Sequence, residues 1–121
     1  MYILSNSADL SYMTLNDFIA GNAYKIFYSE FARHIEAALE QLHAGTPLLK
    51  DDLRGLSGRF HTIKGGAGFF GLTEIVTLSR TLEDAFKEEE ALSAELRREL
   101  TSIVERLREE GSKMPPPQTK G

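Results

Sequence analysis

The sequence of 121 residues contains no cysteine and no tryptophan, and three of its four prolines lie together at residues 115–117. Without cysteine the chain has no disulfide, no thiolate nucleophile and no cysteine-ligated metal, as is typical of proteins from a reducing compartment. Apolar runs are only a few residues long, and residues 1–6 carry neither a basic segment nor a long apolar one. We therefore expect a cytoplasmic protein with no membrane span and no secretion signal.

Positive charge is also scarce. Lys and Arg together number 14 against 18 Asp and Glu, which gives a formal net charge of −4. An acidic surface repels phosphate groups, so we expect neither nucleic acid nor an anionic membrane as a partner. The length and a hydrophobic share of 41% are sufficient for one domain with a single modest core.

Apolar residues recur at spacings of three and four in four stretches, and no stretch alternates in the manner of a strand. This pattern predicts an all-α protein with helices over about residues 22–44, 51–70, 73–87 and 94–110, with Asn22, Thr73 and Ser93 as N-caps. The short connections favour a four-helix up-and-down bundle. The residues expected in its core are Phe27, Phe31, Ile35, Ala38, Leu42, Leu53, Leu56, Phe60, Ile63, Ala67, Phe70, Ile75, Leu78, Leu82, Phe86, Leu96, Leu100, Ile103 and Leu107.

The two ends of the chain lie outside this pattern. Residues 1–21 contain the apolar Leu15, Phe18 and Ile19 but end in Gly21, so we expect at most a short extra helix there. Residues 112–121 contain the three adjacent prolines and predict a solvated, extended linker or tail. The bundle domain is thus expected to span residues 22–111.

The second predicted helix contains five glycines, at positions 55, 58, 65, 66 and 68. Each interior glycine costs roughly 1 kcal/mol relative to alanine, so together they cost about 4–5 kcal/mol of a total stability of about 5–15 kcal/mol. At about 100° per residue, Gly58, Gly65 and Gly68 cluster with Ser57 around His61, roughly 130° from the apolar seam. This strip predicts an exposed imidazole that a second macromolecule can approach closely. Gly66 points elsewhere and is typical of close helix packing.

Other interpretations of these residues are weaker. Gly66, Gly68 and Gly71 spell G-x-G-x-x-G, but a dinucleotide site needs a strand before the first glycine, and none is predicted. Glu30 and His34 are spaced like metal ligands, but the inward-facing Glu-x-x-His pairs of di-metal bundles are missing. We expect His34 and His43 to be surface residues, and no metal site.

Residues 61–72 read HTIKGGAGFFGL. This segment closely resembles the phosphoacceptor motif of histidine-containing phosphotransfer (Hpt) domains, and the likeness extends over about residues 22–110. The resemblance implies that His61 accepts a phosphoryl group from an ATP-dependent histidine kinase domain and passes it to an aspartate of a response-regulator receiver domain. It also implies that Lys64 lies near the phosphoryl oxygens and that Gly65 leaves room for the receiver.

The closest likeness is to the chemotaxis histidine kinases of the CheA type. In that subset a glutamate on the next helix hydrogen-bonds the acceptor imidazole, and the matching residue here is Glu83. Glu83 could instead form an exposed i,i+4 pair with Lys87. Arg80 stands where the subset often has a second histidine, which leaves its part in the site open.

The resemblance implies no cofactor or metal in this domain, since ATP and Mg²⁺ belong to partner domains, and no activity of the domain alone. The expected partner-binding residues are Ser57, Gly58, Gly65 and Gly68. Residues 53–82 contain four basic residues and one acidic residue, which predicts a positive region around His61. A free-standing Hpt protein, a module of a hybrid kinase and a helical interaction module without chemistry remain as alternatives.

Overall fold

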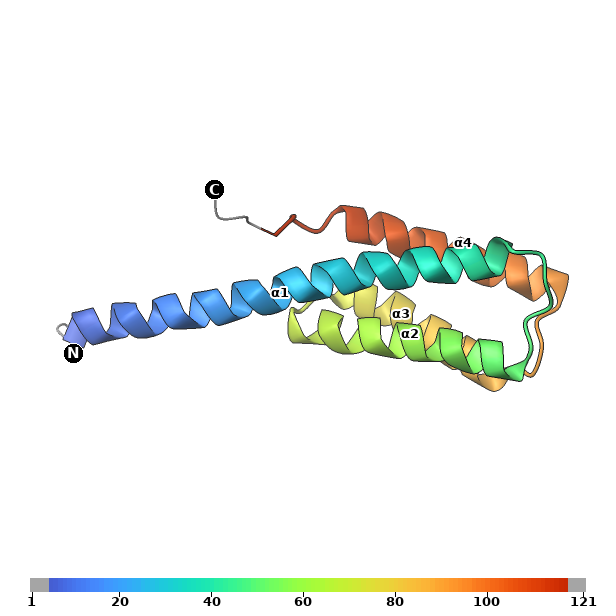
Figure 1. Ribbon diagram of the computed structural model, residues 1–121, viewed down its shortest axis with the longest axis horizontal. Coiled ribbons are helices and arrows are strands. Elements are labelled where there is room, and N and C mark those ends of the chain that lie inside the picture. Colours follow the sequence, from blue (N-terminus) through green and yellow to red (C-terminus); the bar gives the residue numbers. More distant parts are fainter. Residues whose placement is uncertain (1–4, 118–121) are drawn as a thin grey trace.

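The computed structural model describes the backbone of residues 5–117 and the side chains of residues 21–117. Four α-helices make up the described chain (Figure 1): α1 Ser5–His43, α2 Lys50–Phe69, α3 Thr73–Glu88 and α4 Ala94–Ser112. Each helix packs on the next, and α4 returns to α1, which closes the bundle around one core. The predicted all-α, four-helix architecture is confirmed.

The core consists of the apolar seams of the four helices. Nearly all the predicted inward residues are buried, and Phe60 of α2 stacks on Phe86 of α3 with ring centroids 5.8 Å apart. Phe70, Leu96 and Ile103 pack against this core while partly exposed. Burial of such side chains supplies most of the folding free energy, at about 1.5–3 kcal/mol for each large apolar residue. The spacing of three and four in the sequence therefore located the core.

The N-terminal boundary predicted for the first helix is wrong. The helix runs without interruption through Gly21 and Asn22, so Asn22 is not an N-cap, and residues 5–21 belong to α1 rather than to a separate short helix. One exposed glycine costs a helix only about 1 kcal/mol, which the continuous helix on both sides outweighs. In Figure 1 this part of α1 extends past the ends of the other helices. The side chains of Leu15, Phe18 and Ile19 lie outside the described residues.

The predicted end of the last helix is also corrected. The helix continues through Gly111 to Ser112. Gly111 lies against the Phe31 ring of α1, where a methyl group would overlap the ring. Met114 then enters the core, and the Tyr24 hydroxyl donates a hydrogen bond of 2.5 Å to the carbonyl of Pro115. Met114 and Pro115 of the predicted solvated tail are therefore held against the bundle. The last four residues, 118–121, lie outside the described chain.

The helix termini show which capping predictions hold. The Ser93 hydroxyl accepts a hydrogen bond of 3.1 Å from the Leu96 amide, so the predicted cap of α4 is confirmed. Thr73 is instead the first residue of α3, and Leu72 occupies the N-cap position without a side-chain bond. Gly71 adopts φ of +70° and ends the turn after α2, a conformation that favours glycine.

The carbonyl end of α1 is held by a side chain from α4. The Arg97 guanidinium donates hydrogen bonds of 2.8 Å to the carbonyls of Leu42 and Thr46 and one of 3.3 Å to that of Gln41. The last carbonyls of a helix have no partner within the helix, and a cation is favourable at that end. Arg97 therefore links the connection between α1 and α2 to the first turn of α4.

The glycines of α2 divide into one that packs and several that do not. A methyl group at Gly66 would overlap the Phe27 ring of α1, so this glycine permits the close approach of α1 and α2. At Gly55, Gly58, Gly65 and Gly68 a methyl group would meet no atom within 4 Å. Packing therefore explains Gly66, as the sequence indicated, and leaves the others without a structural reason.

Replacing Gly66 by alanine is expected to lower the free energy of unfolding by about 1–3 kcal/mol, the usual cost of overpacking a core. The same change at Gly65 is expected to raise it by up to about 1 kcal/mol, because alanine is the better helix former. Chemical denaturation followed by circular dichroism measures both effects. Equal effects of the two substitutions would contradict the packing role of Gly66.

Candidate functional site

The exposed imidazole of His61 lies in the middle of α2. Its side chain is 68% exposed, whereas Phe60 on one side is fully buried and Ile63 is 1% exposed. Because Phe60 and Ile63 are buried in the core, the backbone of α2 is held in place at His61, and the ring remains open to a second molecule. A ring presented in this way is accessible to a large partner without any opening of the bundle.

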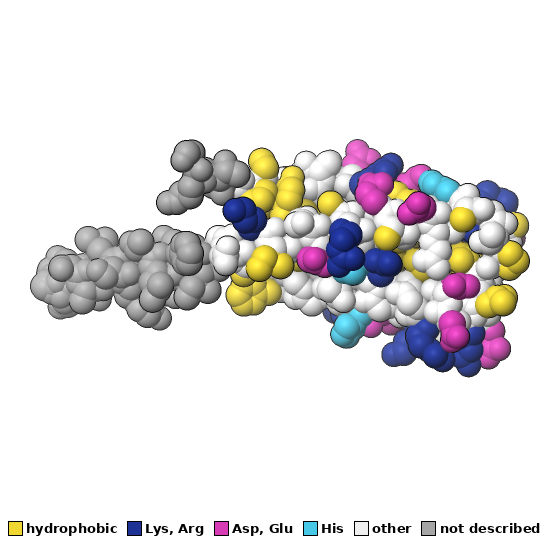
Figure 2. Space-filling model, in the orientation of Figure 1, with side chains coloured by type: hydrophobic (Ala, Val, Ile, Leu, Met, Phe, Trp, Pro, Cys, Tyr) yellow, Lys and Arg dark blue, Asp and Glu magenta, His cyan; other side chains and the backbone are white. Residues whose placement is uncertain are grey.

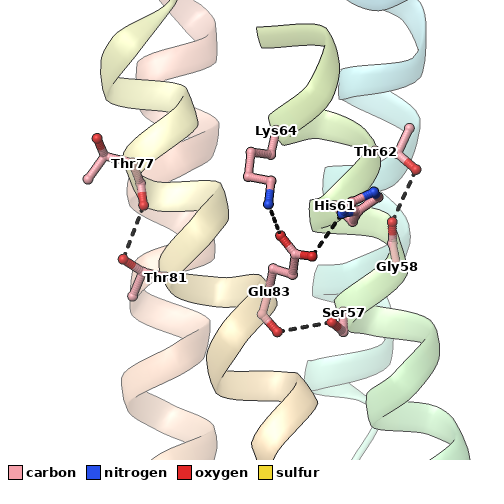
Figure 3. A network of polar contacts seen from close by, with 8 residues as sticks. All are labelled: Ser57, Gly58, His61, Thr62, Lys64, Thr77, Thr81 and Glu83. Atoms are coloured by element: carbon pink, nitrogen blue, oxygen red, sulfur yellow. Dashed lines mark hydrogen bonds and ion pairs between the residues drawn. The ribbon is translucent and has the colours of Figure 1, made fainter. Parts of the chain in front are cut away.

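Glu83 of α3 is the residue that contacts the imidazole (Figure 3). Its Oε2 lies 2.8 Å from His61 Nδ1, and its Oε1 lies 2.6 Å from Lys64 Nζ. The whole residue is buried, with 9% of its surface exposed. Glu83 therefore faces α2 and its two polar residues rather than forming the surface pair with Lys87 that the sequence also allowed.

The hydrogen bond to Glu83 determines which ring nitrogen of His61 is left without a partner from this contact. An ionised carboxylate has no proton to donate, so the proton between the two groups belongs to Nδ1. In the neutral ring the lone pair is then on Nε2. In the neutral form of the ring, this geometry therefore leaves Nε2 as the free nitrogen.

The charge state of Glu83 follows from the same contacts. The Lys64 ammonium group is the largest influence and lowers the pKa of the Glu83 carboxyl, and the hydrogen bond from His61 lowers it further. Burial acts in the opposite direction but is outweighed. Glu83 is therefore ionised at neutral pH and acts as an acceptor for both neighbours.

Ser57 does not lie where the sequence analysis placed it. The side chain is buried, and its hydroxyl donates a hydrogen bond of 2.9 Å to the backbone carbonyl of Glu83 (Figure 3). Ser57 precedes His61 by four residues and so lies about 40° around the helix from it, on the side that α3 covers. Helical geometry alone did not reveal this, because it does not say which neighbour covers which side.

The other three predicted partner-binding residues, Gly58, Gly65 and Gly68, are exposed. They form an open surface beside His61, since no atom lies within 4 Å of the position that a methyl group would take at any of them. A partner can therefore reach the imidazole over bare backbone. We call these three residues the glycine strip.

The positive region predicted around His61 is partly neutralised in the structure. Arg54 pairs with Asp51 at 3.4 Å, and Lys64 pairs with Glu83. Arg80 is exposed on α3, three residues before Glu83. Figure 2 shows acidic and basic side chains mixed over one face of the bundle rather than separated into patches of one sign.

His34 is buried, which corrects its assignment as a surface residue. Its Nδ1 lies 3.1 Å from the Arg59 guanidinium, and its Nε2 lies 3.5 Å from Glu30. Burial, followed by the positive charges of Arg33 and Arg59, lowers the pKa of His34, so this ring is neutral and accepts from Arg59. His43 is exposed, 3.9 Å from Glu105.

In the described part of the chain, no group of three or more His, Cys, Asp or Glu side chains is placed to bind an ion together. None of the described helices is long and apolar enough to cross a bilayer.

A family model described as Hpt domain matches residues 23–110, most of the chain. The chain belongs to the Hpt domain family. Members of this family carry out histidine phosphotransfer in phosphorelays, interact with histidine kinases and response regulators, and need no cofactor of their own. No curated protein and no solved structure matches the chain.

The lowered pKa of Glu83 makes a prediction for acid stability. A carboxyl group whose pKa is lower in the folded than in the unfolded state stabilises the fold above the unfolded value, here about 4.5, and this contribution is lost as the pH falls through the folded value. Relative to Glu83→Gln, the wild-type protein should therefore have an advantage at neutral pH that disappears in acid. Urea unfolding of both proteins across this range measures it, and an advantage that persists unchanged in strong acid would contradict the assignment.

Proposed function

We propose that His61 is the phosphoacceptor of this Hpt domain, with Nε2 as the reacting atom. The observation that supports this most strongly is the exposed imidazole whose Nδ1 is held by the buried Glu83 carboxylate at 2.8 Å. The bond leaves the lone pair on the nitrogen that faces solvent. A neutral imidazole is a competent nucleophile at physiological pH.

In the first step Nε2 forms a bond to the γ-phosphorus of ATP held by a histidine kinase domain. The bond from that phosphorus to the bridging oxygen breaks, and ADP leaves with the electron pair. The ring keeps its Nδ1 proton and becomes positively charged, and the Glu83 carboxylate stabilises that charge. Phosphoryl transfer depends chiefly on positioning and charge neutralisation, so Mg²⁺ and the other donors come with the kinase domain.

In the second step a carboxylate oxygen of a receiver aspartate attacks the same phosphorus. The bond from Nε2 to phosphorus breaks, and its electron pair returns to the ring, which leaves as neutral imidazole with the proton still on Nδ1. Lys64, three residues from His61, is the residue we propose to attract the phosphoryl oxygens. The glycine strip is the surface over which kinase and receiver approach.

The domain has no activity alone in this proposal and is the acceptor part of a phosphotransferase system. The Glu83 contact favours a chemotaxis-type role, because that subset of the family is distinguished by a glutamate at this place. ATP-dependent kinases and receivers of this kind operate in the cytoplasm, where we place this domain.

Incubation with the catalytic domain of a chemotaxis-type histidine kinase and radiolabelled Mg-ATP should place one phosphate on the chain. The linkage should be labile in acid and stable in alkali, as expected for phosphohistidine. The His61→Gln variant should take up no label. Equal labelling of that variant would refute the proposed acceptor.

Gly65→Glu is expected to lower the rate of phosphoryl transfer between the domain and a receiver at least about tenfold, equivalent to about 1.4 kcal/mol. The new side chain would stand beside His61 in open space, so the helix content should not change. Gly55→Glu is the matched control, since a methyl group at Gly55 also meets no atom within 4 Å, while Gly55 lies about 120° around α2 from His61. Transfer that is equally fast in both variants would show that partners do not approach over Gly65.

A further inference from the structure

We propose that Ser57 is a positioning residue for His61, acting through the backbone of Glu83. This inference rests on the proposed function of His61 and adds a component that the phosphoacceptor motif does not contain. Ser57 precedes the motif by four residues and touches neither the imidazole nor the open surface beside it. Its hydroxyl is directed to α3 instead.

Three residues on one side of α2 contact the same residue of α3 (Figure 3). Ser57, His61 and Lys64 follow one another at spacings of four and three, so they line up along the helix. Ser57 Oγ lies 2.9 Å from the Glu83 carbonyl oxygen, while His61 and Lys64 contact the two carboxylate oxygens at 2.8 and 2.6 Å. Glu83 is thus held by α2 at both its backbone and its side chain.

The backbone contact determines where the carboxylate can reach. The apolar contacts between α2 and α3 are not directional, so they allow small sliding or rotation of one helix on the other. A hydrogen bond from Ser57 to the Glu83 backbone fixes the position from which the side chain starts. A carbonyl oxygen has two lone pairs, so it accepts this bond without giving up its bond within α3.

Burial makes this contact persistent. Ser57 and Glu83 are both buried, with 8% and 9% of their surfaces exposed. A buried hydroxyl that loses its partner is not rescued by water, so the bond remains formed in the folded protein. The tautomer of His61 therefore depends on a residue that the ring does not touch.

Thr62 provides a matched control on the same helix. Its hydroxyl also donates to a carbonyl, that of Gly58 at 3.1 Å, but this bond stays within α2. Removal of the Thr62 hydroxyl therefore alters the residue next to His61 without releasing α3. The comparison separates the link between helices from a general effect of losing a hydroxyl near the site.

The experiment uses the full chain in four variants: Ser57→Ala, Ser57→Thr, Thr62→Ala and Glu83→Gln. Nitrogen NMR of the His61 ring measures the fraction with the proton on Nδ1, and phosphoramidate serves as a chemical phosphoryl donor that needs no kinase. For Ser57→Ala we expect a smaller Nδ1–H fraction and phosphorylation slower by about fivefold, equivalent to about 1 kcal/mol. Ser57→Thr, which keeps the hydroxyl, should restore both values, and Thr62→Ala should match the wild type.

The outcomes distinguish this inference from the proposed function. If Glu83→Gln changes the tautomer and the rate while Ser57→Ala matches Thr62→Ala, Ser57 has no positioning role and the proposed function stands. If Ser57→Thr remains as impaired as Ser57→Ala, the hydroxyl is not responsible and the inference is overturned. If none of the variants changes the His61 tautomer, Glu83 does not orient the ring, and both the Ser57 role and the proposed role of Glu83 fail.

Discussion

The burial of one carboxylate between α2 and α3 is the constraint on which the site depends. A buried charge is costly unless it is paired and hydrogen-bonded, so Glu83 requires partners on the helix that it faces. Lys64 and His61 supply them, at 2.6 and 2.8 Å. The ion pair with Lys64 and the hydrogen bond with His61 offset the free-energy cost of burying the carboxylate, and the hydrogen bond also fixes the orientation of the imidazole. Stability and function are therefore joined in this contact.

The helical glycines fall into two groups, those packed against an aromatic ring and those in open space. Gly66 and Gly111 lie against aromatic rings of α1, and each permits the close approach of its helix to α1. The glycine strip meets nothing and reduces helix stability, so the fold alone does not account for it. Destabilising glycines in open space beside an exposed histidine are typical of a surface that binds other macromolecules. The apolar core, which is continuous beneath the glycine strip, offsets this loss of stability.

Much of this could be predicted from the sequence, and the errors have physical causes. The spacing of apolar residues predicted four helices and their core, and the likeness of residues 61–72 to a known motif pointed to the family. Periodicity could not show that α1 continues through Gly21, because a single glycine is a weak helix breaker. Nor could it place Ser57 or His34, whose burial depends on which helix covers them. Met114 was missed because one core residue after a helix end has no periodic signal.

The position of the phosphoryl group on the His61 ring tests the account most directly. Phosphorus and nitrogen NMR of the phosphorylated domain distinguishes a phosphate on Nε2 from one on Nδ1. We expect phosphorylation at Nε2 alone, with the proton retained on Nδ1 and hydrogen-bonded to Glu83. Phosphate on Nδ1 would mean that the contact between His61 and Glu83 is broken during the reaction, and would contradict the central claim.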